Sequence, residues 1–118
     1  MATGILYTGT PAATTATTTY FVPNNTYTVC NVSFTNTSTT TAASIRLYIG
    51  ASLGTAGSPT GSLVASEAIE YGTNIAPGGV FERTGLVLSS TASSKYITVY
   101  CSTATVNVNI YGIETSTS

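Results

Sequence analysis

Few residues in this chain have side chains able to carry out chemistry. Three basic and four acidic residues are ionised at pH 7, and the sequence has no His and no Asp. They are Arg46, Arg83, Lys95, Glu67, Glu70, Glu82 and Glu114. This inventory excludes a Ser-His-Asp triad, His-based zinc sites and EF-hand loops.

A carboxylate pair would have to come from the four glutamates. Glu67 and Glu70 are three residues apart, which on a strand places their side chains on opposite faces. The glycine-containing stretch APGG (76–79) is not followed by Lys-Ser/Thr, so it predicts a turn rather than a phosphate-binding loop. We therefore expect no catalytic residue, no cofactor site and no metal site.

The two cysteines, Cys30 and Cys101, both lie on the apolar, inward register of β-like segments. Their spacing resembles that of the inter-sheet disulfide of immunoglobulin domains. The accompanying features are missing, because the chain has no Trp and the residue two before Cys101 is Val99 rather than Tyr. Two interpretations stay open: separate core thiols, which suit a cytoplasmically made protein, or a disulfide.

Four tyrosines form the candidate interface: Tyr48, Tyr96, Tyr100 and Tyr111. Each falls on the polar register of its segment, opposite the apolar positions. Tyrosine combines a large apolar area with a hydroxyl group and is enriched at protein interfaces. The alternative is that these rings pair with their neighbours across a half-solvated sheet.

The elements that must position these residues are strands. Alternation of apolar and polar residues is clearest in 27–35, 45–49, 95–101 and 106–111. Less regular strands are expected at 4–8, 17–22, 62–71 and 79–88. A helical turn within 63–71 is the alternative for the third of these, but Gly61 and Gly72 bracket a run of strand length.

Gly, Pro and Asn punctuate these segments, and the glycine-rich stretch 50–61 predicts a long connection. Strands that recur at such intervals predict an all-β fold, an antiparallel β-sandwich of about eight strands, either jelly-roll or immunoglobulin-like. At 118 residues the chain is expected to form a single domain, 1–118, with an N-terminal extended segment at 1–16.

The surface is unusually poor in charge, since charged residues make up 6% of the chain and the net charge is -1. Three cations cannot provide the footprint that a phosphate backbone requires, so nucleic acid is not an expected partner. A nearly uncharged surface favours association, which predicts a homo-oligomer or a subunit packed against others. A monomer with a hydroxyl-rich coat is the alternative.

The first ten residues, MATGILYTGT, contain neither a basic region nor a long apolar run. They predict neither a secretory signal nor a membrane span. We therefore expect synthesis in a cytoplasm and no membrane partner.

Three segments resemble small β-sandwich structural proteins of tailed bacteriophages. They are TTTYFVPNNTYTVCNVSFTNTSTTTAASIRLYI (17–49), NIAPGGVFERTGLVLSS (74–90) and KYITVYCSTATVNVNIYGIETS (95–116). The resemblance implies a virion component without enzymatic activity, made in the host cytoplasm. Its leading form is a decoration or cement protein on the capsid exterior, with the major capsid protein or other virion proteins as partners. The alternatives are a neck, tail or fibre subunit, or a module that binds host glycans.

Overall fold

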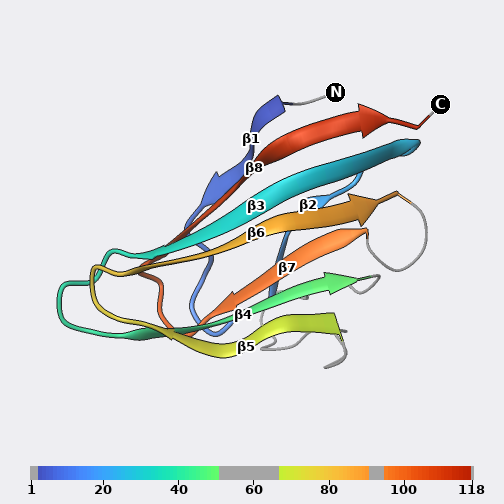
Figure 1. Cartoon of the computed structure of the whole chain (residues 1–118). Helices are drawn as coiled ribbons and strands as arrows, with labels where there is room; N and C mark the ends of the chain where they lie inside the picture. Colours follow the sequence, from blue (N-terminus) through green and yellow to red (C-terminus); the bar gives the residue numbers. More distant parts are fainter. Residues whose placement is uncertain (1–2, 51–66, 91–94, 118) are drawn as a thin grey trace.

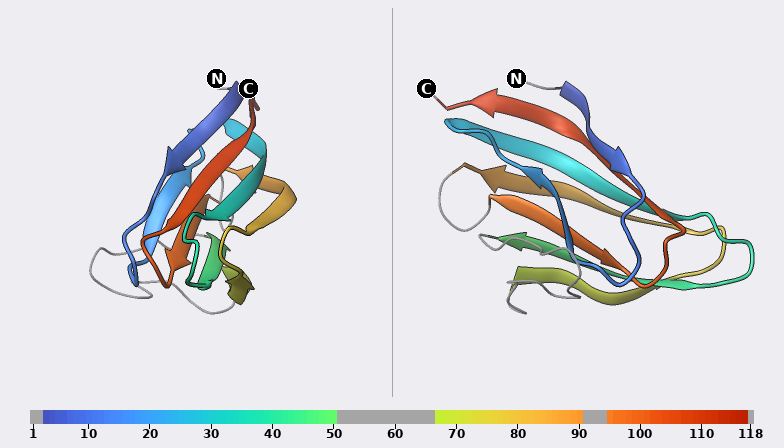
Figure 2. Two further views of the ribbon diagram at one scale, coloured as in Figure 1. Left: turned by 90° about the vertical axis from the view of Figure 1, so that its left-hand side faces the viewer. Right: turned by 180° about the vertical axis from the view of Figure 1, so that it is seen from behind.

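The computed structural model describes residues 3–50, 67–90 and 95–117, and this part of the chain forms eight strands (Figure 1). They are β1 (Thr3–Gly9), β2 (Thr17–Phe21), β3 (Thr26–Asn36), β4 (Ala43–Gly50), β5 (Ala68–Ile75), β6 (Val80–Ser89), β7 (Tyr96–Cys101) and β8 (Val106–Ser116). Two four-stranded antiparallel sheets pack face to face as a β-sandwich. Figure 2 shows the two layers from further directions.

The strand order identifies the sandwich as a jelly roll. Sheet A has the order β1-β8-β3-β6 and sheet B the order β2-β7-β4-β5. The chain's first strand therefore pairs with its last, the second with the seventh, the third with the sixth and the fourth with the fifth. Of the two expected architectures, the jelly roll has this arrangement of eight strands in two Greek keys, and the immunoglobulin-like order differs.

The space between the sheets is filled by the alternating apolar residues of the four central strands. β3 and β8 contribute from sheet A, and β4 and β7 from sheet B. Their fully buried side chains are Cys30, Val32, Phe34, Val106, Val108 and Ile110 on one side and Ala43, Ile45, Leu47, Ile97, Val99 and Cys101 on the other. Burial of this shared face is the main stabilising contribution to the fold.

Seven of the eight expected strands occur at or near the predicted positions, whereas the strand predicted at 62–71 was placed too early. β5 begins at Ala68 and continues through Gly72 to Ile75. Gly72 has a φ of +84°, so it provides an irregularity within the strand rather than its end. Residues 62–66 of that prediction, and 51–61 of the predicted glycine-rich connection, lie outside the described residues.

The N-terminal segment contains an extended strand, β1, at the edge of sheet A. The chain then crosses to sheet B through residues 10–16, where Thr14 adopts a left-handed conformation. The Thr14 backbone N–H donates to the carbonyl oxygen of Cys101 at 2.9 Å. This crossing segment is therefore fastened to the end of β7.

Every edge strand is irregular, and neither central pairing is. The pairings of β1 with β8, β2 with β7, β6 with β3 and β5 with β4 each contain a register shift. The pairings of β3 with β8 and of β4 with β7 contain none. Bulges twist an edge and interrupt its row of free hydrogen-bonding groups, so these edges are poor templates for the addition of another strand.

Asn36, the last residue of β3, joins three connections at one end of the sandwich, at the left of Figure 1. Its buried side-chain Nδ2 donates to the carbonyl oxygens of Thr41 at 2.8 Å and Ile75 at 3.2 Å. Its Oδ1 accepts from the hydroxyl of Thr105 at 3.0 Å and the backbone N–H of Ser38 at 3.1 Å. One amide side chain therefore ties together the β3–β4, β5–β6 and β7–β8 connections.

Replacement of Asn36 should lower the free energy of unfolding. Asn36→Ala leaves buried carbonyl and hydroxyl groups without their partner, and we expect the free energy of unfolding to fall by about 2–3 kcal/mol in urea denaturation. At pH 7 Asn36→Asp should lower the free energy of unfolding more than Asn36→Ala does, because a carboxylate would face carbonyl oxygens. At acidic pH this variant should regain stability, because the protonated carboxyl group can donate a hydrogen bond. The matched control is Asn74→Ala, at an exposed position of β5, which should change stability little. Equal losses for Asn36→Ala and Asn74→Ala would contradict this role.

Candidate functional site

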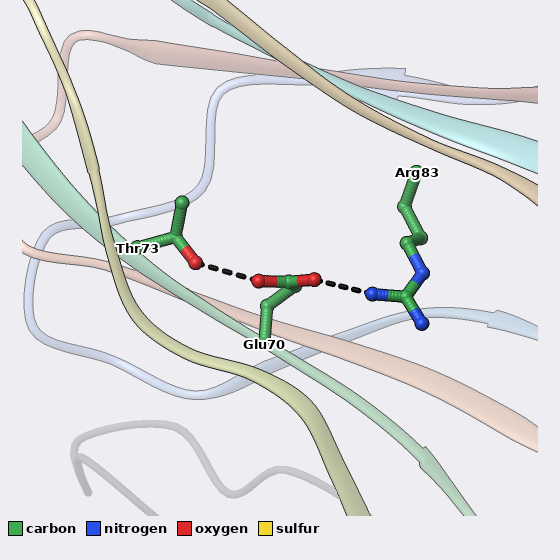
Figure 3. A network of polar contacts seen from close by, with 3 residues as sticks. All are labelled: Glu70, Thr73 and Arg83. Carbon is green, nitrogen blue, oxygen red and sulfur yellow. Dashed lines mark hydrogen bonds and ion pairs between the residues drawn. The ribbon is translucent and has the colours of Figure 1, made fainter.

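A polar network links the two sheets at the open edge between β5 and β6 (Figure 3). Glu70 of β5 lies opposite Leu47, and Arg83 of β6 lies opposite Val32, so both side chains start on the inward faces. Arg83 Nη1 donates to Glu70 Oε2, and the hydroxyl of Thr73 donates to Glu70 Oε1 at 2.7 Å. The carboxylate of Glu70 is thus engaged by a cation and a hydroxyl, and its role here is to close the edge of the sandwich.

A second polar network joins the sheets through Tyr20 of β2. Its hydroxyl donates to Glu114 Oε2 of β8 and lies 2.8 Å from the hydroxyl of Thr28 on β3. Burial first, and then the hydrogen bond to Glu114, raises the pKa of Tyr20 well above its ordinary value. The phenol therefore stays protonated and holds a strand of sheet B to two strands of sheet A.

Both cysteines are buried free thiols on the inward faces of their strands, Cys30 on β3 and Cys101 on β7. The sequence left open separate core thiols or a disulfide, and in the structure the two cysteines are separate core thiols. Burial raises the pKa of Cys30 to about 11 and that of Cys101 to about 12. Since the thiolate is the nucleophile and the metal ligand, these protonated groups are inert packing residues at neutral pH.

The raised thiol pKa values predict a loss of stability in alkali. An unfolded thiol ionises near pH 9, whereas the folded thiols ionise at about 11 and 12, so the unfolded state loses protons first. The stabilisation is complete below about pH 9 and declines as the pH rises through the folded values. Urea denaturation between pH 8 and 10.5 should show this decline, with a shallower slope for Cys30→Ala/Cys101→Ala. A residual slope from Tyr20, whose pKa is also raised, should persist in that variant. Identical slopes for the two proteins would contradict the prediction.

The four tyrosines of the predicted interface do not form one surface. Tyr111 lies on the outer face of sheet A, where its hydroxyl donates to Glu82, while Tyr96 and Tyr100 lie on the outer face of sheet B. The prediction that Tyr48 is an exposed interface residue is wrong: it is 2% exposed, and its ring packs edge-on against Tyr71. A register shift between β4 and β5 occurs at this position. Contact of the other three with a partner stays a prediction.

A tyrosine that the sequence analysis did not single out forms a cationic platform on the outer face of sheet B. Arg46 of β4 lies directly between Tyr71 of β5 and Tyr100 of β7 in the cross-strand register. Its guanidinium carbon is 4.4 Å from the centroid of the Tyr71 ring and 4.5 Å from that of Tyr100. Such cation–π pairs hold the rings in place. Tyr71 is 61% exposed, so this platform presents an aromatic ring to solvent.

Among the residues that the structure describes, the largest group of exposed apolar side chains lies on the outer face of sheet A. We define the apolar patch as Ile5 (63% exposed), Val29 (43%), Val87 (66%) and Ile113 (53%). Val29 of β3 is directly opposite Val87 of β6 on one side and Ile113 of β8 on the other. Ile5 of β1 is opposite Tyr111, the residue two before Ile113. The patch therefore crosses all four strands of the sheet.

The alternating pattern did contain a signal for this patch. Val29 and Ile113 continue the register that the sequence analysis assigned to polar residues, and Val87 stands between two apolar residues, Leu86 and Leu88. Single exposed apolar residues are common on protein surfaces, and only a contiguous patch of them indicates an interaction surface. Without the strand order, however, no pattern shows that these three residues are neighbours.

Two common features of small-molecule sites, a cavity and a metal-binding cluster, are absent from the described residues. Within 3–50, 67–90 and 95–117 no cavity of ligand size is present, and no three potential metal-binding side chains come together. In the same ranges no helix is long and apolar enough to cross a membrane.

Comparison with known proteins gave no relative: no family model, no curated protein and no solved structure matches the chain significantly.

Proposed function

We propose that this protein is a non-enzymatic structural subunit of a bacteriophage virion and that it decorates the outside of the capsid. The observation that carries the proposal is the apolar patch, which leaves Ile5, Val29, Val87 and Ile113 exposed on a folded sandwich. Exposed apolar side chains that are contiguous over several strands mark a surface for association. A protein whose surface is specialised for association acts by binding other proteins.

Three further features support this role. The ionised side chains are used for structure, since Arg83 binds Glu70 between the sheets and Glu82 accepts the hydroxyl of Tyr111. The segments 17–49, 74–90 and 95–116 resemble virion β-sandwich proteins. The jelly roll also recurs in viral capsid proteins, although it occurs in lectins as well, so the fold supports the proposal by analogy alone.

Capsids with and without this protein test the proposal. We expect the purified chain to bind capsids that lack it, at a fixed ratio to the major capsid protein. Binding should raise the temperature at which these capsids rupture. Saturation and rupture can be followed by sedimentation and by dye access to the packaged genome. Capsids that are equally stable without the protein, and that do not bind it, would overturn the proposal. A copy number far below that of the major capsid protein would assign the chain to the neck, tail or fibre instead.

The cationic platform of Tyr71, Arg46 and Tyr100 favours a second candidate function, the binding of host glycans. Sugar rings stack on exposed aromatic faces, and the half-buried guanidinium offers hydrogen-bond donors beside them. If glycans bind there, Tyr71→Ala should abolish the signal on a glycan array, whereas Tyr27→Ala on the outer face of sheet A should retain it. Absence of wild-type binding at millimolar sugar concentrations would remove this candidate.

A further inference from the structure

The two arginines of this chain have different surroundings. Arg83 pairs with Glu70 between the sheets, whereas the guanidinium group of Arg46 forms no hydrogen bond and no ion pair with any of the described residues. It lies instead between the rings of Tyr71 and Tyr100, which restrict its movement and its hydration. Its N–H donors are therefore held in place and are available to an acceptor from outside this part of the chain.

The carboxylates of the described residues all lie away from Arg46. Three of the four glutamates accept hydrogen bonds from the side chains described above: Glu70, Glu82 and Glu114. The carboxyl group of the fourth, Glu67, lies over the outward side of Gly50, four residues or about 13 Å along β4 from Arg46. The described surface around Arg46 is therefore positively charged and complements an anionic group.

A bulge at Gly72 places Tyr71 beside Arg46. Thr73 is opposite the buried Ile45, so its side chain starts on the inner face of sheet B. Tyr71, two residues earlier, is opposite Arg46 and lies on the outer face. On a regular strand these two positions would share a face, so the register shift at Gly72, whose φ is +84°, turns Tyr71 outward. Bulges are frequent beside functional sites, where they redirect a side chain in this way.

Small polar side chains continue the outer face next to the cationic platform. Ser44 is two residues before Arg46, about 7 Å along the same face, and Asn74 lies opposite Ser44 on β5. Among the described residues, neither the Ser44 hydroxyl nor the Asn74 amide has a hydrogen-bond partner. Hydroxyl and amide groups can exchange hydrogen bonds with sugar hydroxyls, and the exposed ring of Tyr71 offers a face for stacking.

We propose that the cationic platform binds sugars that carry a carboxylate group. The carboxylate pairs with the guanidinium edge of Arg46, since this group matches carboxylate geometry with two parallel hydrogen bonds. The sugar ring stacks on Tyr71, and its hydroxyls reach Ser44 and Asn74. This assignment rests on glycan binding, the second candidate function, and names the ligand class; it is independent of capsid decoration.

The number of cations favours a sugar over an acidic protein segment. Arg46 is the one cation of the platform. Lys95 directly precedes β7 (Tyr96–Cys101), so it lies at the other end of that strand from Tyr100 and about 17 Å away. A run of acidic residues would need several cations close together, whereas one carboxylate on a sugar needs one.

NMR titration of the isotope-labelled full chain at pH 7 tests this assignment. Galacturonic acid and galactose are matched probes, because they differ only in a carboxylate that replaces a hydroxymethyl group. The dissociation constant should be about tenfold lower for galacturonic acid, since a charge-assisted hydrogen bond is roughly twice as strong as a neutral one. Sialyllactose and lactose form a second pair, which distinguishes a sialic acid from a uronic acid as the source of the carboxylate. The Arg46 Nε–H resonance should shift with the acidic sugars.

Three variants locate the effect. Arg46→Gln removes the charge and keeps hydrogen-bonding groups, so it should abolish the preference for the acidic sugar. Lys95→Gln removes the same charge at the other end of β7 and should keep the preference. Tyr71→Ala should weaken the binding of acidic and neutral sugars alike. If Arg46→Gln does not fold, as judged by circular dichroism, Arg46→Lys replaces it, and the preference should fall because the planar fork is lost.

Each outcome decides the assignment. A preference for either acidic sugar that Arg46→Gln removes and Lys95→Gln retains would support it. Equal binding of acidic and neutral sugars, or a preference that Arg46→Gln leaves unchanged, would overturn it while glycan binding itself stands. Absence of binding of all four sugars at millimolar concentrations would remove glycan binding as well. A tetra-aspartate peptide that binds the platform more tightly than both acidic sugars would assign it to an acidic protein partner and overturn the sugar ligand.

Discussion

The unbroken pairing of β3 with β8 is the constraint on which the rest of the structure depends. Eleven consecutive residue pairs, from Thr26 with Ser116 to Asn36 with Val106, keep one register along the whole of sheet A. A shift of one residue would turn every inward side chain outward, so burial of Phe34 and Val108 holds this register strongly. The same register places Val29 beside Ile113 on the solvent side. The core and the apolar patch are thus two consequences of one alignment.

The scarcity of charge gives hydroxyl and amide groups tasks that ionised groups often perform. Asn36 connects three loops through its side chain, and Tyr20 links the sheets through a phenol hydroxyl. The ion pair between Arg83 and Glu70 closes the opposite edge, where it is partly exposed and its contribution to stability is modest. Protection of the edges also depends on backbone geometry rather than on lysines, because bulges occur in all four edge pairings. A surface built in this way stays low in charge.

The outer faces of the two sheets expose side chains of different chemistry. Among the described residues, the outer face of sheet A presents a row of exposed aliphatic side chains, Val87, Val29 and Ile113, with Glu82 as its one charged group. Sheet B presents Arg46 between two tyrosine rings, which suits a contact with polar groups or with a different protein. Tyrosine and arginine, together with tryptophan, are the residue types enriched among interface hot spots.

The sequence by itself determined the all-β class, seven of the eight strands and the inward direction of residues such as Cys30 and Ile97, because period-two alternation is a local property of the chain. It also determined the poverty of charge and the inventory of side chains. Only the tertiary structure decided the jelly-roll order, since which strands become neighbours depends on contacts far apart in the sequence. For the same reason the four tyrosines fell on two opposite faces, Tyr48 became buried, and Val29, Val87 and Ile113 came together. Alternation reports on which side of a strand a residue lies, and only the packed sheets report what lies beside it.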